Sequence, residues 1–336
     1  MISRIEYLGK VFSQISHSFS LSSRLLPTDI RRVNTVLYLM ARIADTIEDC
    51  NLSIEEKKKY FKIYKEILDN GKETGITTLL DMLKAEHANF SNPEFNLIAN
   101  IPSVINELES LKSEEKNVIK DEVTTMMEGM EKFLERRIQT FDDQNEYCHY
   151  VAGTVGEALT TLYYINGHIS AEAMILLNSS ENFALALQKV NMIRGIRDDF
   201  KKKRIEEANR IYVPQELLDS HNVRMDDLFD LKFKNEALSV LNELVADSKR
   251  YFRDSLNYLT TIPQEEFGIR KFSSVILFIS LSMLIKCRDN YAIFLNDDEI
   301  GLSFIDKMKV FRNSRMYAKD DSKLKRYHSR LIGSLN

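Results

Sequence analysis

The chain has 336 residues, of which 44% are hydrophobic, so it holds enough apolar material for a sizeable core and is not intrinsically disordered. Its 46 lysines and arginines are interspersed with 50 aspartates and glutamates, which gives a net charge of -4. No basic stripe is present, and we therefore expect no nucleic-acid partner.

Three widely separated cysteines fit neither a disulfide framework nor a zinc site. The N-terminus lacks the apolar core of a signal peptide, and no stretch reaches the roughly 18 apolar residues of a membrane span. The most apolar segment, residues 272 to 285, is expected to be a buried core helix. We expect a cytoplasmic monomer, with membrane association limited to peripheral contact for product release.

Eleven glycines and five prolines are few for this length, and helix-forming residues are abundant, so the sequence predicts an all-α protein. The prolines, together with the tracts at 91 to 103 and 178 to 182, are expected to separate helices. No internal repeat is visible, and residues 1–336 are expected to form a single helical domain. Helices are predicted over 28–50, 53–70, 75–88, 103–137, 141–166, 169–178, 181–203, 225–228, 235–261, 266–291 and 299–312.

The segment from 33 to 50 begins as a helix that is apolar on nearly every face and then becomes acidic. Spacings of three and four residues place Asp45, Glu48 and Asp49 on one side, with Arg42 and Tyr38 one and two turns before Asp45. Clustered carboxylates in a water-poor cavity favour a hard cation such as Mg²⁺, particularly with phosphate present. The alternative is a solvated helix end on which Arg42 pairs with Asp45.

A second predicted helix repeats this pattern, with polar residues at spacings of three, four and seven among apolar ones. They are Gln188, Asn191, Arg194, Asp198 and Asp199. If the two acidic helices face each other, metal ions would bridge their carboxylates and a diphosphate, which would then leave readily. The alternative is that the cations at 201 to 204 form local salt bridges with Asp198 and Asp199.

A third segment, from 147 to 164, has Ala152, Gly153 and Gly156 at helical spacing. Glycine is unfavourable inside a helix, so its presence suggests close approach of another helix or of a ligand chain. Tyr147 and Tyr150 lie beside these small residues, and their aromatic faces would stabilise a carbocation.

Six segments in order resemble the squalene and phytoene synthase family, the head-to-head prenyltransferases. They are SHSFS (16–20), YLMARIADTIED (38–49), MEGMEKFL (127–134), EYCHYVAGTVGEAL (146–159), LQKVNMIR (187–194) and RIYVPQELL (210–218). The resemblance covers most of the chain. YCHYVAG together with LQKxN is most similar to squalene synthases, whereas TVGE also resembles the dehydrosqualene and phytoene branch.

The resemblance implies a class I isoprenoid synthase helical fold with a central cavity for two prenyl diphosphates. It implies catalytic roles for Tyr147, Tyr38 and Arg42, and metal binding by the acidic residues Asp45, Glu48, Asp49, Asp198 and Asp199. It implies diphosphate binding by Ser16, His17, Ser18, Arg42, Gln188, Asn191, Arg194, Arg210, Lys309 and Arg312. The implied cofactors are Mg²⁺ and, in squalene synthases, NADPH.

Two departures from the family pattern concern charge. The family's second motif has an aspartate directly after the arginine, whereas here Gly195 follows Arg194 and supplies no ligand oxygen. His17 stands where an arginine or lysine is usual and would be only partly charged near neutral pH.

The resemblance implies that two farnesyl diphosphates are joined through a cyclopropylcarbinyl diphosphate and then reduced to squalene. Gly195 keeps open a dehydrosqualene- or phytoene-type reaction, or a single half-reaction, without reduction. A third hypothesis is a non-catalytic family member that acts as a binding or assembly protein, and the retained acidic face on a buried helix argues against it.

Overall fold

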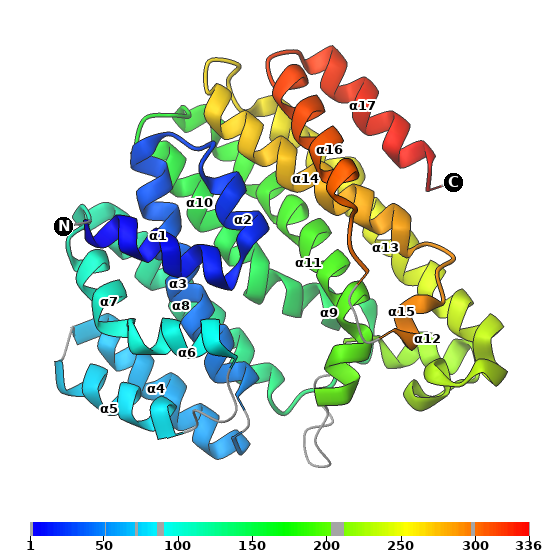
Figure 1. The fold of residues 1–336 in the computed structure, drawn as a ribbon, viewed down its shortest axis with the longest axis horizontal. Helices are drawn as coiled ribbons and strands as arrows, with labels where there is room; N and C mark the ends of the chain where they lie inside the picture. Colours follow the sequence, from blue (N-terminus) through cyan, green and yellow to red (C-terminus); the bar gives the residue numbers. More distant parts are fainter. Residues whose placement is uncertain are drawn as a thin grey trace. The chain divides into compact units, whose positions relative to one another are not determined.

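The computed structural model describes residues 3–50, 52–70, 73–85, 91–202, 212–296 and 300–335. Helices and no strands occur in these ranges, which confirms the all-α prediction (Figure 1). The chain divides into two compact units, Met1–Glu135 with Thr154–Ala171, and Arg136–Gly153 with Glu172–Asn336. They are called unit 1 and unit 2 below. The single domain expected from the sequence stays a prediction.

In unit 1, helix α3 runs through the core and packs against α8 and α10, which explains why its first half is apolar on nearly every face. The described helices of this unit are α1 (Arg4–Ile15), α2 (His17–Ser23), α3 (Thr28–Asp49), α4 (Ile54–Asn70), α5 (Glu73–Ala85), α6 (Asn92–Ala99), α7 (Ile101–Glu109), α8 (Ser113–Phe133) and α10 (Thr154–Ile165).

In unit 2, the long helix α11 packs along α13 and also contacts α14. The elements in this part of the chain are α9 (Phe141–Cys148), a π-helical turn η2 (His149–Gly153), 3-10 turn η3 (Ala171–Met174), α11 (Ile175–Lys202), α12 (Gln215–Ser220), 3-10 turns η4 (Met225–Phe229) and η5 (Leu231–Phe233), α13 (Lys234–Thr261), α14 (Phe267–Cys287), α15 (Ala292–Leu295), α16 (Phe304–Tyr317) and α17 (Asp321–Gly333). Helices α16 and α17 both lie against α14 (Figure 1).

Prolines begin helices in this fold, as their fixed φ and missing N–H allow. Pro27 and Pro214 are N-cap residues of α3 and α12, and Pro93 and Pro102 lie in the first turns of α6 and α7. The tract at 91 to 103 was therefore wrongly predicted to be only a break. It contains α6 and the start of α7.

Three other boundaries differ from the predictions. The Ser-rich tract at 178 to 182 lies inside α11, because packing along α13 outweighs the weak helix propensity of serine and asparagine. The predicted helix at 103–137 is two helices, and Lys112 begins the second, with Glu115 accepting a hydrogen bond from its backbone. The predicted helix at 141–166 contains the π-turn. Helices α1, α2, α6, α12, α15 and α17 were not predicted.

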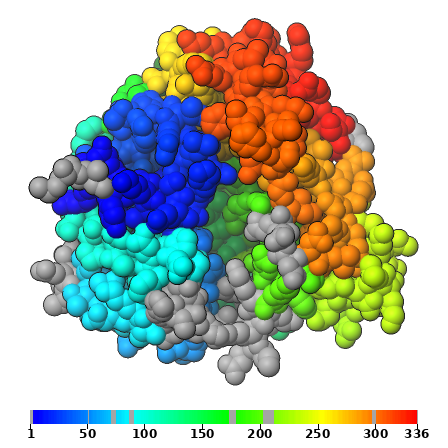
Figure 2. All heavy atoms as spheres, in the orientation of Figure 1, coloured from blue at the N-terminus to red at the C-terminus, as the bar shows by residue number. Residues whose placement is uncertain are grey.

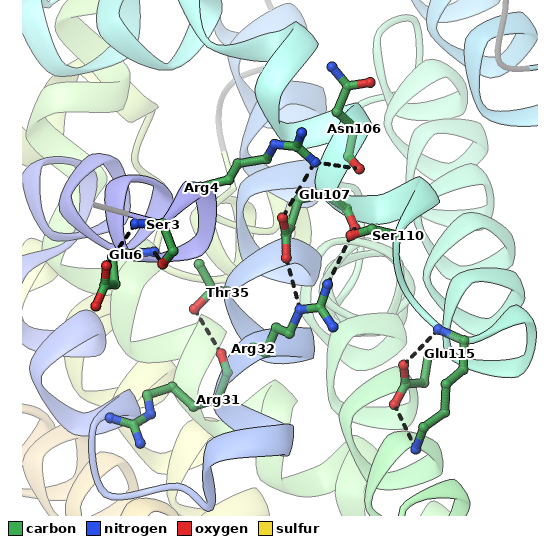
Figure 3. Close-up of polar contacts among 11 residues, drawn as sticks. Ser3, Arg4, Glu6, Arg31, Arg32, Thr35, Asn106, Glu107, Ser110 and Glu115 are labelled. Carbon is green, nitrogen blue, oxygen red and sulfur yellow. Dashed lines mark hydrogen bonds and ion pairs between the residues drawn. The ribbon is translucent and has the colours of Figure 1, made fainter. Parts of the chain in front are cut away.

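A buried carboxylate ties three helices of unit 1 together (Figure 3). Glu107 on α7 is 4% exposed, and its Oε1 accepts a hydrogen bond of 2.8 Å from Arg32 of α3. Its Oε2 lies 3.8 Å from Arg4 of α1, which also donates to the carbonyl of Asn106. Two cations thus compensate one buried negative charge, as burial of a carboxylate requires.

The sequence was expected to hold no stretch long enough for a membrane span, but by length and composition helix α14 is the one helix in the described part of the chain that could cross a membrane. Its most apolar window has a mean hydropathy of 1.6, and 61% of that window is buried inside the protein. It contacts α11, α13, α16 and α17, so it has the environment of the core helix expected from the sequence.

All three cysteines are buried thiols outside any disulfide. Cys50 ends α3 in unit 1, whereas Cys148 and Cys287 end α9 and α14 in unit 2. Burial raises the pKa of both Cys148 and Cys287 to about 12, so these thiols stay protonated at neutral pH.

Arg270 on α14 is fully buried and holds the ends of three other helices. It donates to the backbone carbonyls of Ile262, after α13, and Ala318, after α16, and it pairs with the carboxylate of Asp321 at the start of α17. We expect Arg270→Met to lower the free energy of unfolding by about 3 kcal/mol, because these acceptors lose their donor. Urea denaturation measures the change.

The matched control is Arg224→Met, because Arg224 is also paired with an aspartate but its side chain is 82% exposed. Its loss is expected to cost less than about 1 kcal/mol. Equal effects of the two substitutions would contradict the structural role assigned to Arg270.

Candidate functional site

The acidic end of α3 carries a charged cluster on the face that the sequence predicted. Arg42 lies 3.4 Å from Asp45 and 3.2 Å from Glu94 of α6. Glu94 also accepts the backbone N–H of Ser91 and so caps α6. The pairing of Arg42 with Asp45, which the sequence raised as part of the structural alternative, is therefore present, and Glu94 shares the same cation.

Tyr38 lies two turns before Asp45 in an aromatic cluster. Its ring stacks on Phe12 of α1 at 4.2 Å and lies 5.2 Å from Phe19 of α2. Burial raises the pKa of Tyr38, and a hydrogen bond with the side chain of Ser16 partly opposes this. The structure thus brings the SHSFS segment against Tyr38, with Ser16 half-buried and His17 and Ser18 exposed at the start of α2.

The three predicted carboxylate ligands on α3 have different environments. Asp49 is exposed, Asp45 is half-buried, and Glu48 is only 8% exposed. Burial raises the pKa of Asp45 to about 6, Asp49 adds to this effect, and Arg42 opposes it. One arginine therefore does not fully compensate the negative charge at Asp45, and a bound cation would stabilise its ionised form.

On α11, the side chain of Arg194 binds a backbone carbonyl. Its Nε donates to the carbonyl of Ile300 at 2.9 Å, and Arg197 donates to the carbonyl of Phe294 at 2.6 Å. These bonds hold the chain around α15 against α11. Asn191 lies one turn before Arg194 and Gln188 nearly two turns before it. The side-chain amides of Gln188 and Asn191 are 3.5 Å apart.

Gly195 leaves room for the carboxylate of Asp199. A Cβ built on Gly195 would lie 3.1 Å from Asp199 Oδ2, tighter than ordinary contact. Gly195 is inside α11 and does not have a positive φ, so backbone conformation does not require glycine here. Asp198 and Asp199 are both half-buried. The side chain of Asp199 thus folds back over Gly195.

Tyr147 is 4% exposed on α9 and pairs with another tyrosine. Its hydroxyl lies 3.1 Å from that of Tyr212, and the two rings stack at 4.9 Å with an angle of 23°. Tyr212 belongs to the quoted segment RIYVPQELL but was not predicted to be a site residue. The only sequence signal for Tyr212 was its position within that motif, and this position does not indicate that it pairs with Tyr147.

The π-turn η2 follows Tyr147 directly, and π-turns inside helices occur frequently at functional sites. His149 in this turn lies 3.0 Å from Glu181 at the start of α11, and the hydrogen bond from His149 lowers the pKa of Glu181. A Cβ on Gly153 would lie 3.1 Å from His149 Nδ1. The ring of His149 therefore explains the glycine that suggested a close helix or ligand.

Three predicted diphosphate-binding cations remain to be placed. Lys309 and Arg312 are exposed on α16, whose atoms are uncovered on the face drawn in Figure 2, in orange. Arg210 lies outside the described residues.

Lys189 is a buried charge that sequence reasoning passed over. It is 2% exposed, and its ammonium lies 2.6 Å from Asp247 of α13 and 2.6 Å from the side-chain oxygen of Gln144. The sequence signal for a buried charge was a lysine that lies between Leu187 and Val190 in a largely apolar helix.

Comparison with known proteins agrees with this architecture. A family model described as squalene/phytoene synthase matches residues 12–282. Squalene synthase 2 of Panax ginseng is 28% identical over 284 residues, which are 84% of this chain and 63% of that protein. The chain thus spans less than two thirds of the length of that relative.

Solved structures resemble this one in fold. TcSQS in complex with the ligand BPH1237 has a TM-score of 0.83 at 24% identity, covering 98% of this chain and 91% of that one. A dehydrosqualene synthase solved with a ligand has a TM-score of 0.62 at 18% identity, covering 94% and 96%. The fold is therefore the helical isoprenoid synthase fold of squalene synthases. With a family model matched over most of its length, the chain belongs to the squalene/phytoene synthase family.

Proposed function

We propose that the chain is a Mg²⁺-dependent prenyltransferase that joins two farnesyl diphosphates head to head, as a squalene synthase does. The observation that carries the proposal is the cluster of Tyr38, Arg42 and Asp45 on α3, with the pKa of Asp45 raised to about 6. A structural helix end would be solvated, whereas this one holds a half-buried carboxylate whose charge is only partly compensated. Family membership supports the same chemistry.

The donor set fits Mg²⁺. Asp45 and Asp49 offer hard oxygens on one side of α3, and Asp198 and Asp199 offer them on α11. When bound, Mg²⁺ would neutralise the charge that develops on the departing diphosphate. Glu48 also belongs to the proposed set, although its carboxylate is the most buried of the three on α3.

The chain's own residues would bind and orient the substrates. We assign diphosphate contacts to Ser16, His17 and Ser18 beside Tyr38, to Gln188, Asn191 and Arg194 on α11, and to Lys309, Arg312 and Arg210. Arg42 would contact diphosphate while keeping its bond to Asp45, because a guanidinium has several donors. The stacked pair of Tyr147 and Tyr212 presents two hydroxyls, and Tyr147 would act on the cyclopropyl-forming step.

A single half-reaction is the second candidate, and Gly195 is the observation that favours it. This position lacks the family's leading carboxylate, so α11 offers one oxygen ligand fewer to the metal. The cyclopropylcarbinyl diphosphate, which must ionise again, would then accumulate. An unreduced dehydrosqualene-type product and a non-catalytic binding role are the remaining alternatives.

The deciding experiment incubates the purified chain with farnesyl diphosphate and Mg²⁺, with and without NADPH, and analyses hydrocarbons and diphosphates. Squalene formed only with NADPH is the expected result. An accumulating cyclopropyl diphosphate would support the half-reaction, and an unreduced hydrocarbon the second enzymatic alternative. If the chain shows no turnover and binds no diphosphate, the enzymatic hypotheses are refuted and only the non-catalytic hypothesis remains.

Protonation of Asp45 is expected to weaken metal binding below pH 6. A carboxylate with a pKa of about 6 is ionised above that pH and protonated below it, so Mg²⁺ affinity should rise as pH increases from 5 to 7. Calorimetric titration with Mg²⁺ and diphosphate at several pH values measures this. Below pH 6 the fall should approach about tenfold per pH unit.

Asp45→Asn should remove this pH dependence and abolish turnover while helix content stays unchanged. The matched control is Asp69→Asn, which alters an exposed carboxylate on α4 of the same unit. Wild-type activity in Asp45→Asn would refute the assignment of this face to the reaction.

Gly195→Asp is expected to keep the fold and raise Mg²⁺ affinity or turnover, because it restores the missing carboxylate. Gly195→Ala is the matched control, since both variants add the Cβ that pushes Asp199 aside but only one adds oxygens. Affinity should increase in Gly195→Asp relative to Gly195→Ala. Lost activity in Gly195→Asp alone would indicate that glycine is adapted to a different reaction.

A further inference from the structure

A continuous chain of contacts in unit 2 leads from a buried ion pair to the hydroxyl of Tyr147. This chain of contacts ends at Tyr147 and Tyr212, whose hydroxyls are 3.1 Å apart. Tyr147 is held in α9, whereas Tyr212 lies outside any helix, before α12. Helical hydrogen bonds therefore do not hold the backbone carbonyl of Tyr212, and another partner can bind it.

Gln144, one turn before Tyr147 on α9, supplies that bond. Its Nε2 donates to the carbonyl oxygen of Tyr212 at 2.7 Å, and its side chain is 3% exposed. The following residues are also bound near the start of α9, where the backbone N–H of Gln215 donates to the carbonyl of Ile138. The chain that carries Tyr212 is thus fixed on α9.

Lys189 fixes the orientation of the Gln144 amide. An ammonium has donors and no acceptor, so the Gln144 atom that lies 2.6 Å from Lys189 Nζ must be the oxygen. The amide nitrogen is then directed to the Tyr212 carbonyl. A neutral partner such as a hydroxyl, which both donates and accepts, would not impose this orientation.

Asp247 is the acidic partner of Lys189 in an apolar environment. The two lie 2.6 Å apart with side chains 2% and 8% exposed, and the ammonium also lies 5.1 Å from the ring centre of Tyr251. Buried ion pairs are often replaceable by apolar residues without loss of stability. Stability alone therefore does not account for a buried pair here, whereas orientation of Gln144 does.

We infer that Lys189, Asp247 and Gln144 are positioning residues that set the place of Tyr212 and, through it, of the Tyr147 hydroxyl. This inference rests on the proposed function, because it gives the network a role in the step assigned to Tyr147. The alternative is that the ion pair only joins α11 to α13, in which case Tyr147 would not respond to its removal.

Two variants separate these readings. Gln144→Met cuts the link to Tyr212 and leaves the ion pair in place. Lys189→Met combined with Asp247→Leu removes both charges together, which avoids leaving one of them buried and unpaired. Gln264→Met is the matched control, since Gln264 is exposed in the same unit.

The first readout is the ¹⁹F NMR signal of Tyr147 in protein labelled with 3-fluorotyrosine, assigned with Tyr147→Phe. We expect this signal to shift or broaden in Gln144→Met and in the double variant, but not in Gln264→Met. An unchanged signal in both folded variants would overturn the inference. Because this readout needs no turnover, it decides the matter even where the proposed function fails.

The second readout is steady-state kinetics with farnesyl diphosphate. Misplacing a reacting group without removing substrate contacts should lower kcat about tenfold and leave KM within about twofold. Unchanged kcat in both variants of an active enzyme would also overturn the inference. A raised KM with unchanged kcat would do the same, because it would indicate lost substrate binding.

Discussion

Charges on buried helices must be compensated by partners from neighbouring helices, and this constraint governs the whole structure. Glu107 is compensated by arginines of α1 and α3, Arg270 by the ends of α13, α16 and α17, and Lys189 by Asp247. Each such contact joins residues of different helices. The exception is Asp45, whose charge Arg42 only partly offsets. The proposed cation site therefore differs in charge compensation from the other buried charges described here.

Sequence patterns predicted the helices with strong periodicity well. The apolar run of α3 and its acidic end were evident because burial and charge follow the helical repeat. The prolines were predicted only to separate helices, whereas four of them lie at the starts of α3, α6, α7 and α12. The failures came from residues with two roles. Serine and asparagine both cap helices and break them, so the tract at 91 to 103 began two helices, while the tract at 178 to 182 lay within one.

The candidate site was predictable in its motifs and not in its contacts. Tyr38, Arg42 and Asp45 share a face by spacing alone, whereas the part played by Glu94 depends on how α6 packs. Lys189 and Gln144 stand 45 residues apart, and nothing local to either indicates the other. Gly195 was visible as a missing ligand, but the reason it is tolerated, the folded-back side chain of Asp199, required coordinates.

The burial of all three cysteines makes the native chain unreactive toward thiol reagents, so alkylation can occur only when the structure around a thiol opens. Cys50 lies in unit 1, and Cys148 and Cys287 lie in unit 2. The alkylation rate of each thiol therefore reports how often the structure around it opens in unit 1 or unit 2. Matching rates at Cys50 and Cys287 would mean that the two units open as one cooperative body, and separate rates would mean that each holds its own stability.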